Sequence, residues 1–206
     1  MDFARPLQAV SPTLDGDVLT VLARAEEAFS GRRLHRLVGR GSEAGVRKAV
    51  ERLVGQGIVL RSQAGRAKLY RLNRQHLCAE SIEHLVATPS ALVLDLRDEI
   101  ELWEIPPRYA ALFGSVARRE AGPQSDLDLL IVRPDDVGAD SPTWLRQLGH
   151  LEDAATAWTG NDARIVELGE EELTGGTCLL QGVLKDGIEL FGSLRSLRAA
   201  VDKGRR

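Results

Sequence analysis

Two segments decide how the second half of the chain folds: Tyr109-Ala110-Ala111-Leu112-Phe113-Gly114-Ser115 and, after ten intervening residues, Asp126-Leu127-Asp128-Leu129-Leu130. The apolar run of the first segment predicts a buried strand that leads into a Gly-Ser turn. The second segment predicts another strand, which extends to Val132. Residues at i and i+2 of a strand share one face, about 6.6 Å apart. Both Asp side chains should therefore point the same way, while Leu127 faces the core.

The same two segments bring groups that bind anions together with groups that bind cations. Gly114 has no Cβ and allows another molecule to approach its backbone closely, Ser115 adds a hydroxyl, and Arg118 or Arg119 can add a phosphate contact, with Arg118 favoured. Two carboxylates on one strand face can converge on hard divalent cations such as Mg²⁺ or Mn²⁺. The pattern predicts that Gly114, Ser115 and Arg118 bind the phosphates of a nucleoside triphosphate (NTP). Asp126 and Asp128 would bind the metal.

This order of Gly-Ser, spacer and Asp-hydrophobic-Asp resembles the signature of the DNA polymerase β nucleotidyltransferase superfamily. Over residues 90–193 the chain is similar to the small bacterial members, the minimal nucleotidyltransferases, including their terminal helix and short strand at Asp186–Gly192. The resemblance implies a mixed sheet flanked by helices. It also implies metal-dependent transfer of a nucleotidyl group from an NTP to a hydroxyl acceptor. Such domains often belong to toxin–antitoxin pairs, which is a further hypothesis.

The resemblance also implies a third carboxylate, the base for the incoming hydroxyl, on a later strand. That strand is predicted at residues 163–168, and Arg164 stands where the acid is expected. Asp162 and Glu167 are the alternatives, and alternation along a strand allows only one of them to face the site. Asp162 is favoured as the third catalytic residue, and Arg164 is then a phosphate contact. A missing base would slow transfer by about 100- to 10,000-fold.

The first half of the chain is strongly basic. Between Ser30 and His76 it carries twelve Lys and Arg against two Glu, a net charge of +10, whereas the whole chain has a net charge of −3. The remainder therefore carries −13. Such asymmetry indicates one module that binds a polyanion and one acidic module.

Periodicity in this basic half predicts three helices followed by a hairpin. The expected elements are helices over residues 16–29, 30–39 and 42–56 and strands over 58–61 and 68–72, with Ser30 and Ser42 as N-caps. The order resembles the winged helix-turn-helix regulators of bacteria, which implies that the third helix enters the major groove of DNA. A winged helix used for dimerisation or protein contact is the alternative. The candidate DNA-binding residues are Arg47, Lys48, Arg52, Arg61, Arg66 and Lys68.

The predicted fold class is α/β (α+β), with an N-terminal winged helix-turn-helix and a C-terminal mixed sheet of the nucleotidyltransferase type flanked by helices. The expected domains are a winged helix at 12–76, a helical connector at 77–89, a nucleotidyltransferase-like domain at 90–193 and a C-terminal tail at 194–206. The favoured function is nucleotidyl transfer coupled to DNA binding. The alternative is a DNA-binding transcriptional regulator whose second domain is degenerate or senses a nucleotide.

The composition of the chain indicates the compartment in which the protein works and the partners that it has. The chain has no apolar run near the ~20 residues of a membrane span and no basic start followed by an apolar core. Its two cysteines, Cys78 and Cys178, lie far apart and form no paired motif, which favours a reducing compartment. We therefore expect a cytoplasmic protein without a membrane partner. The expected partners are DNA, an NTP and a second copy of the chain.

Overall fold

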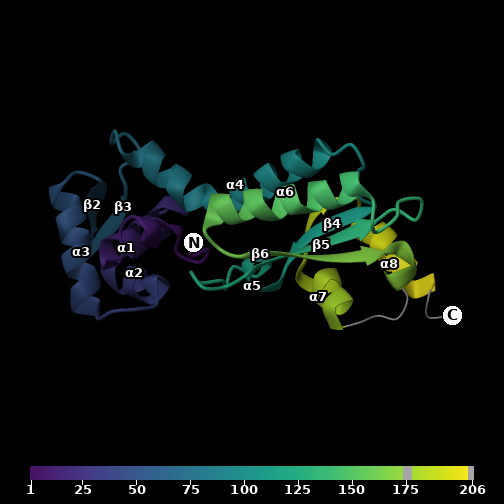
Figure 1. The fold of residues 1–206 in the computed structure, drawn as a ribbon. Coiled ribbons are helices and arrows are strands. Elements are labelled where there is room, and N and C mark those ends of the chain that lie inside the picture. The colour runs from purple at the N-terminus through teal and green to yellow at the C-terminus, as the bar shows by residue number, and fades with distance from the viewer. Residues whose placement is uncertain (174–177, 204–206) are drawn as a thin grey trace. The chain divides into compact units, whose positions relative to one another are not determined.

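The computed structural model describes residues 1–173 and 178–203, which form two compact units (Figure 1). The N-terminal unit comprises Asp2 and residues 4–89, and the C-terminal unit comprises Met1, Phe3 and the chain from Ser90 onward. Among the described helices, none combines the length and the apolar character that crossing a bilayer requires. Each unit has a hydrophobic core of its own.

The N-terminal unit is mainly helical with one small antiparallel sheet. Its elements are η1 (Pro6–Ala9), α1 (Leu14–Ala23), β1 (Phe29–Ser30), α2 (Gly31–Val38), α3 (Glu43–Gly55), β2 (Val59–Ala64), β3 (Ala67–Leu72) and the first part of α4 (Ala79–Glu101). The strand order is β1-β3-β2. The first helix is shorter than the predicted 16–29, because Phe29 is buried in the core and pairs with Tyr70 as part of β1. Tertiary packing there overrides local helical preference.

The predicted helix caps of this unit are present. The hydroxyl of Ser30 accepts a hydrogen bond from the backbone N–H of Arg33 at 3.3 Å, and the hydroxyl of Ser42 accepts one from Gly45 at 3.0 Å. Gly39 ends α2 with a φ of 70°, a left-handed conformation that glycine adopts without strain. These caps fix where α2 and α3 begin, and so which faces of the two helices reach the core.

Helix α4 runs without interruption through Pro89, where the two units divide. Proline has no backbone N–H, so the carbonyl of Leu85, four residues earlier, loses its usual helical partner. The hydroxyl of Thr88 donates a hydrogen bond to that carbonyl at 2.9 Å and replaces the lost one. The expected connector at 77–89 is therefore half of a longer helix.

The C-terminal unit is built on a mixed sheet of order β6-β5-β4-β7, which confirms an α/β fold at this level. Its further elements are β4 (Tyr109–Phe113), α5 (Gly114–Ala117), β5 (Leu127–Arg133), α6 (Pro142–Thr159), β6 (Ala163–Gly169), η2 (Glu170–Leu173), α7 (Cys178–Asp186), β7 (Ile188–Phe191) and α8 (Leu194–Lys203). Strands β5 and β6 are parallel, and the other pairs are antiparallel. The segment expected to be a tail forms α8, because Leu197 and Val201 bury themselves in the core.

Helices cover both faces of this sheet. The second half of α4 and α6 pack on the face that receives Leu127, Leu129 and Ile131 of β5, whereas α7 and α8 pack on the face that receives Leu130 and Val132 (Figure 1). The alternation of β5 places Asp128 on the second face, which α7 and α8 cover. Asp128 stands at the start of the strand, where the helices leave it partly exposed.

Tyr109 offers a direct test of this packing. Its side chain is 2% exposed, and among the described residues its hydroxyl has no hydrogen-bond partner. Burial, followed by the charge of Glu189, raises the pKa of Tyr109 to about 12. We expect the free energy of unfolding of Tyr109→Phe to equal that of wild type or to exceed it by about 1 kcal/mol, because the substitution removes an unsatisfied buried polar group.

The pH dependence of the free energy of unfolding distinguishes removal of the unsatisfied Tyr109 hydroxyl from a general change in packing. Above about pH 10 the unfolded phenol loses its proton while the folded one keeps it, so the wild type loses stability as pH rises toward 12. Tyr109→Phe should therefore lose less stability than wild type over that range in urea titrations. A strongly destabilised Tyr109→Phe would show that the hydroxyl has a partner.

Candidate functional site

The Gly-Ser corner and the first carboxylates of β5 meet at one end of the sheet. Phe113, the last residue of β4, pairs with Asp128 of β5, so the chain turns at Gly114 directly beside the Asp128 side chain. Gly114 has a φ of 73°, and a Cβ at this position would collide with Oδ2 of Asp128 and lie 3.3 Å from its Cγ. Only glycine allows this approach. The predicted encounter of corner and carboxylate is therefore present.

The negative charge of Asp126 acts on the Asp128 carboxyl group at this end of β5. Burial raises the pKa of Asp128, and the negative charge of Asp126 raises it further. The positive charges of Arg164 and Arg118 act in the opposite direction without cancelling the rise. Asp126 precedes the strand itself, which begins at Leu127. Two carboxylates that repel each other in a partly buried place favour the arrival of a cation.

Strand β6 brings an arginine to the position expected for a third acid. Arg164 pairs with Asp128 in the parallel register of β5 and β6. Its Nη1 atom lies 2.7 Å from Oδ2 of Asp126, and its Nη2 atom lies 3.7 Å from Oδ2 of Asp162. The side chain of Asp162 is 72% exposed. Asp162 therefore lies at the rim of the site, with the guanidinium between it and Asp126.

Glu167, the alternative third acid, lies elsewhere. Its Oε1 atom accepts hydrogen bonds from Nε of Arg133 at 2.6 Å and from Nε1 of Trp144 at 3.3 Å. It pairs with Ile131, on the sheet face opposite to that of Arg164. The predicted alternation thus leaves Asp162 as the acid on the side of the site.

Asn161, which no sequence pattern indicated, holds the loop before Asp126. Asn161 is 2% exposed, and its side-chain amide donates hydrogen bonds to the carbonyls of Gly122 at 3.2 Å and Ser125 at 2.8 Å. The Ser125 hydroxyl accepts a hydrogen bond from the N–H of Gly122 at 3.0 Å and so closes the turn. An amide just before a strand was the only sequence signal, because the bonded partners lie more than 30 residues away.

The two remaining predicted nucleotide contacts are partly free. Among the described residues, no hydrogen bond involves the hydroxyl of Ser115, which stands in the short helix α5 after Gly114. Arg118 is exposed, and its Nε atom lies 2.9 Å from Oε2 of Glu120. A surface pair of this kind contributes at most about 1 kcal/mol, so an incoming phosphate can compete for Arg118.

We expect Gly114→Ala to damage the site and the fold together. The new methyl would displace the Asp128 carboxylate, and alanine disfavours the positive φ, so the free energy of unfolding should fall by about 1–3 kcal/mol. Gly122→Ala is the matched control, because a Cβ there meets no atom within 4 Å. Chemical denaturation measures both variants. A Gly114→Ala protein as stable as Gly122→Ala would contradict the close approach.

The carboxylates fit a metal of one particular kind. Mg²⁺ is commonly held by one or two carboxylates together with substrate phosphates and water. Over residues 1–173 and 178–203, no group of three or more His, Cys, Asp or Glu side chains could hold a metal ion. The donor set therefore fits a cation shared with a nucleotide, and it does not fit a cation held by protein ligands alone.

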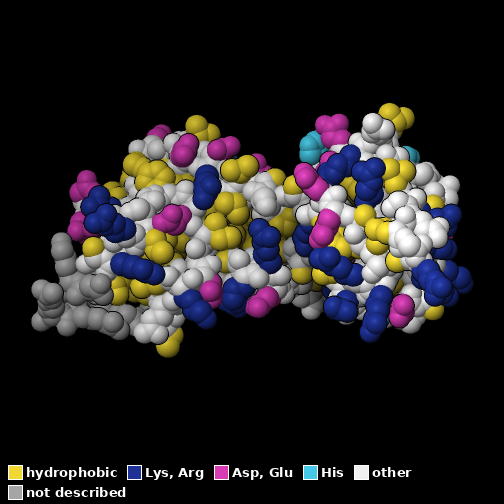
Figure 2. All heavy atoms as spheres, turned by 180° about the vertical axis from the view of Figure 1, so that it is seen from behind, with side chains coloured by type: hydrophobic (Ala, Val, Ile, Leu, Met, Phe, Trp, Pro, Cys, Tyr) yellow, Lys and Arg dark blue, Asp and Glu magenta, His cyan; other side chains and the backbone are white. Residues whose placement is uncertain are grey.

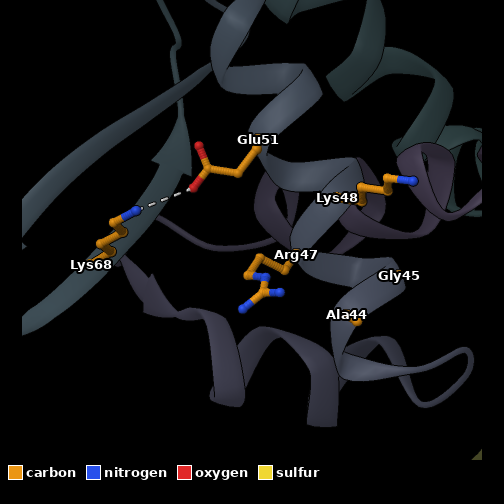
Figure 3. A pocket seen from close by; sticks show the side chains of 6 residues that line it. All are labelled: Ala44, Gly45, Arg47, Lys48, Glu51 and Lys68. Atoms are coloured by element: carbon orange, nitrogen blue, oxygen red, sulfur yellow. Dashed lines mark ion pairs between the residues drawn. The ribbon is translucent and has the colours of Figure 1, made fainter.

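The second candidate site is the basic surface of the N-terminal unit, seen at the right of Figure 2. A pocket of about 730 Å³ opens beside α3, and Arg47, Lys48 and Lys68 are among the residues that line it. Figure 3 shows the side chains of Arg47 and Lys48 extending from α3 in different directions. Among the described residues, no ion pair or hydrogen bond involves the side chains of Arg47, Lys48 or Arg66. These three cations are available to a ligand.

The other basic candidates are engaged within the unit. Arg52 lies 2.5 Å from Asp15 of α1, and although burial pushes the pKa of Asp15 up, the hydrogen bond and charge of Arg52 outweigh it and leave that pKa below its ordinary value. Glu51 lies 3.0 Å from Arg61 and 3.7 Å from Lys68. Arg52 therefore ties α3 to α1, whereas Arg61 and Lys68 share one carboxylate near the pocket.

Comparison with known families finds one match, which lies within the C-terminal unit. Residues 96–173 match the model of the nucleotidyltransferase domain. The match contains the Gly114 corner, the carboxylates of Asp126 and Asp128, and Arg164, and it ends together with η2 at Leu173. No protein with a curated description matches the chain significantly.

Solved structures with partial similarity are complexes of toxins and antitoxins. One is a toxin–antitoxin crystal structure with AMP-PNP, with a TM-score of 0.38, 20% identity and coverage of 56% of this chain and 82% of that chain. Another is a tri-AMPylated HEPN toxin of Shewanella oneidensis with its MNT antitoxin, with a TM-score of 0.35, 19% identity and coverage of 57% and 81%. A third is MntA-HepT, with a TM-score of 0.34, 20% identity and coverage of 57% and 81%. Similarity this weak does not establish a common function.

Proposed function

We propose that the C-terminal unit transfers a nucleotidyl group from an NTP to a hydroxyl acceptor with the help of Mg²⁺ or Mn²⁺. The observation that carries the proposal is the Gly114 corner packed against the Asp128 carboxylate, with Asp126 beside it. The match of residues 96–173 to the nucleotidyltransferase domain supports it. Such a corner brings a backbone turn without a Cβ beside two ligands of a hard cation.

Each residue then has a definite role. Asp126 and Asp128 would hold the metal, which when bound neutralises phosphate charge. Ser115 donates its hydroxyl to a phosphate oxygen, with Gly114 allowing the close approach. Arg118 adds a charged contact at the rim. Asp162, the acid on the site's side of β6, would accept the proton of the attacking hydroxyl, and its exposure leaves it accessible to a large acceptor.

We propose further that the N-terminal unit is a winged helix that binds DNA. Three helices followed by the β2–β3 hairpin, with α3 presenting Arg47 and Lys48 and the hairpin turn presenting Arg66, support this assignment. Unpaired cations on one helix and one turn can neutralise phosphates on either side of a groove. Arg52 is left out of the proposed contacts because Asp15 already holds it.

A regulator with an inactive second domain is the other candidate. The observation that favours it is Arg164, a cation where the family resemblance implies a third acid. In that case nucleotide binding would change DNA affinity without any transfer. A toxin–antitoxin role stays a prediction from the sequence.

Incubation with α-³²P-labelled NTPs, Mg²⁺ and candidate protein and nucleic-acid acceptors tests the first proposal. Wild type should label an acceptor, and Asp126→Asn/Asp128→Asn should not. Equal labelling by both proteins would rule out the assigned site. Nucleotide binding with no label on any acceptor would favour the regulator.

A further inference from the structure

The position of Arg164 suggests how this site is kept from holding a metal by itself. Its guanidinium lies 2.7 Å from Oδ2 of Asp126 and reaches toward Asp162 as well. The side chain of Asp126 is 35% exposed and that of Arg164 is 61% exposed, so only the carboxylate end of the pair is partly shielded from water. One of the two metal ligands is therefore already occupied by a cation of the protein.

A divalent ion that arrives alone must displace this cation. It would also meet only the two carboxylates of β5 as a ligand group, because the described residues supply no cluster of three. Arg164 is positively charged at any physiological pH, so it repels the ion as well as competing for Asp126. Both effects weaken metal binding to the protein without nucleotide.

A triphosphate changes the balance. A guanidinium binds phosphate oxygens through two parallel N–H donors, at least as well as it binds one carboxylate oxygen. Transfer of Arg164 from Asp126 to a phosphate frees the carboxylate at the moment when the phosphates bring further metal ligands. The same movement removes a positive charge from the metal position and places it on the nucleotide.

We propose that Arg164 is a positioning residue that couples metal binding to nucleotide binding: it blocks Asp126 in the free protein and is drawn away by the nucleotide's phosphates. This inference rests on the proposed function, since it assumes that the site takes a nucleotide. It predicts that metal and nucleotide each strengthen the binding of the other, as reciprocal coupling requires.

Arg164→Gln tests the coupling, because it removes the charge and should leave the fold intact. The side chain is 61% exposed, so its loss opens no cavity in the core. Free Mn²⁺ is measured by electron paramagnetic resonance, first without nucleotide and then with a non-hydrolysable ATP analogue. Binding of the analogue is measured by calorimetry with Mg²⁺.

We expect opposite changes in the two affinities. Without nucleotide, Arg164→Gln should bind Mn²⁺ about three- to tenfold more tightly than wild type, and it should bind the analogue about tenfold more weakly. The strengthening of Mn²⁺ binding by the analogue should shrink. Arg146→Gln is the matched control, since that arginine is 64% exposed and pairs with Glu104 outside the site; neither affinity should change.

The outcomes separate the two proposals. One outcome is that wild type binds both ligands and Arg164→Gln binds Mn²⁺ no more tightly than wild type does. That result would overturn the coupling and leave the proposed function standing. Wild type that binds neither Mn²⁺ nor the analogue would overturn both. If Arg164→Gln and Arg146→Gln gain equally in affinity for Mn²⁺, the effect comes from net charge alone. That result would overturn the specific role of Arg164.

Discussion

Asp128→Asn is expected to lower the rate of nucleotidyl transfer by about 1000-fold or more. The substitution removes the carboxylate that lies against Gly114, and an amide oxygen is a far poorer ligand for Mg²⁺. Initial rates of transfer from labelled NTP, measured at saturating metal, give the effect. Asp153→Asn is the matched control, because it removes the same charge from an exposed position of α6.

Stability should change in the direction opposite to activity. The pKa of Asp128 is raised by burial and by Asp126, so the folded protein disfavours its ionised form at neutral pH. A neutral side chain relieves that cost, and Asp128→Asn should melt at the same temperature as wild type or above it. An inactive variant that also melts lower would point to misfolding. An active Asp128→Asn would remove Asp128 from the mechanism.

The double charge reversal Arg47→Glu/Lys48→Glu is expected to lower affinity for duplex DNA by about 100-fold at low salt. Both side chains are exposed on α3, and neither has a described partner within the unit, so their charge is available to phosphates. The slope of log affinity against log salt should fall by about 2, one for each lost phosphate contact. Fluorescence anisotropy across a salt series measures both quantities.

The control must change net charge equally. Lys185→Glu/Arg195→Glu carries the same change on α7 and α8 of the C-terminal unit and should leave DNA affinity nearly unchanged. Equal losses in both double variants would mean that DNA responds only to net charge. Wild type that fails to bind DNA at low salt would remove the winged helix from the proposal.

Much of the site could be predicted because its signals are local. An apolar run, a Gly-Ser turn and an alternating Asp-Leu-Asp segment each specify their own conformation, and their order specifies the antiparallel pairing of β4 and β5. The caps at Ser30 and Ser42 were predictable for the same reason. The winged-helix assignment stays a prediction.

What escaped prediction depends on contacts between distant segments. The ion pair of Arg164 with Asp126 requires the parallel register of β5 and β6, which no local pattern encodes. The strand β1 forms because β3 offers an edge, and α8 forms because the sheet offers an apolar face. Asn161 is bonded to carbonyls that the sequence separates from it by more than 30 residues.

The uninterrupted α4 has a consequence for how the protein melts. Ile82 and Val86 serve one hydrophobic core, and Leu92, Leu96 and Ile100 serve the other. If either core is lost, about half of the helix has nothing to pack against, and an isolated stretch of that length is marginal in water. Unfolding of one unit should therefore destabilise the helix on which the other unit also depends. A scanning calorimeter should record overlapping transitions, whereas two freely tethered domains would give independent ones.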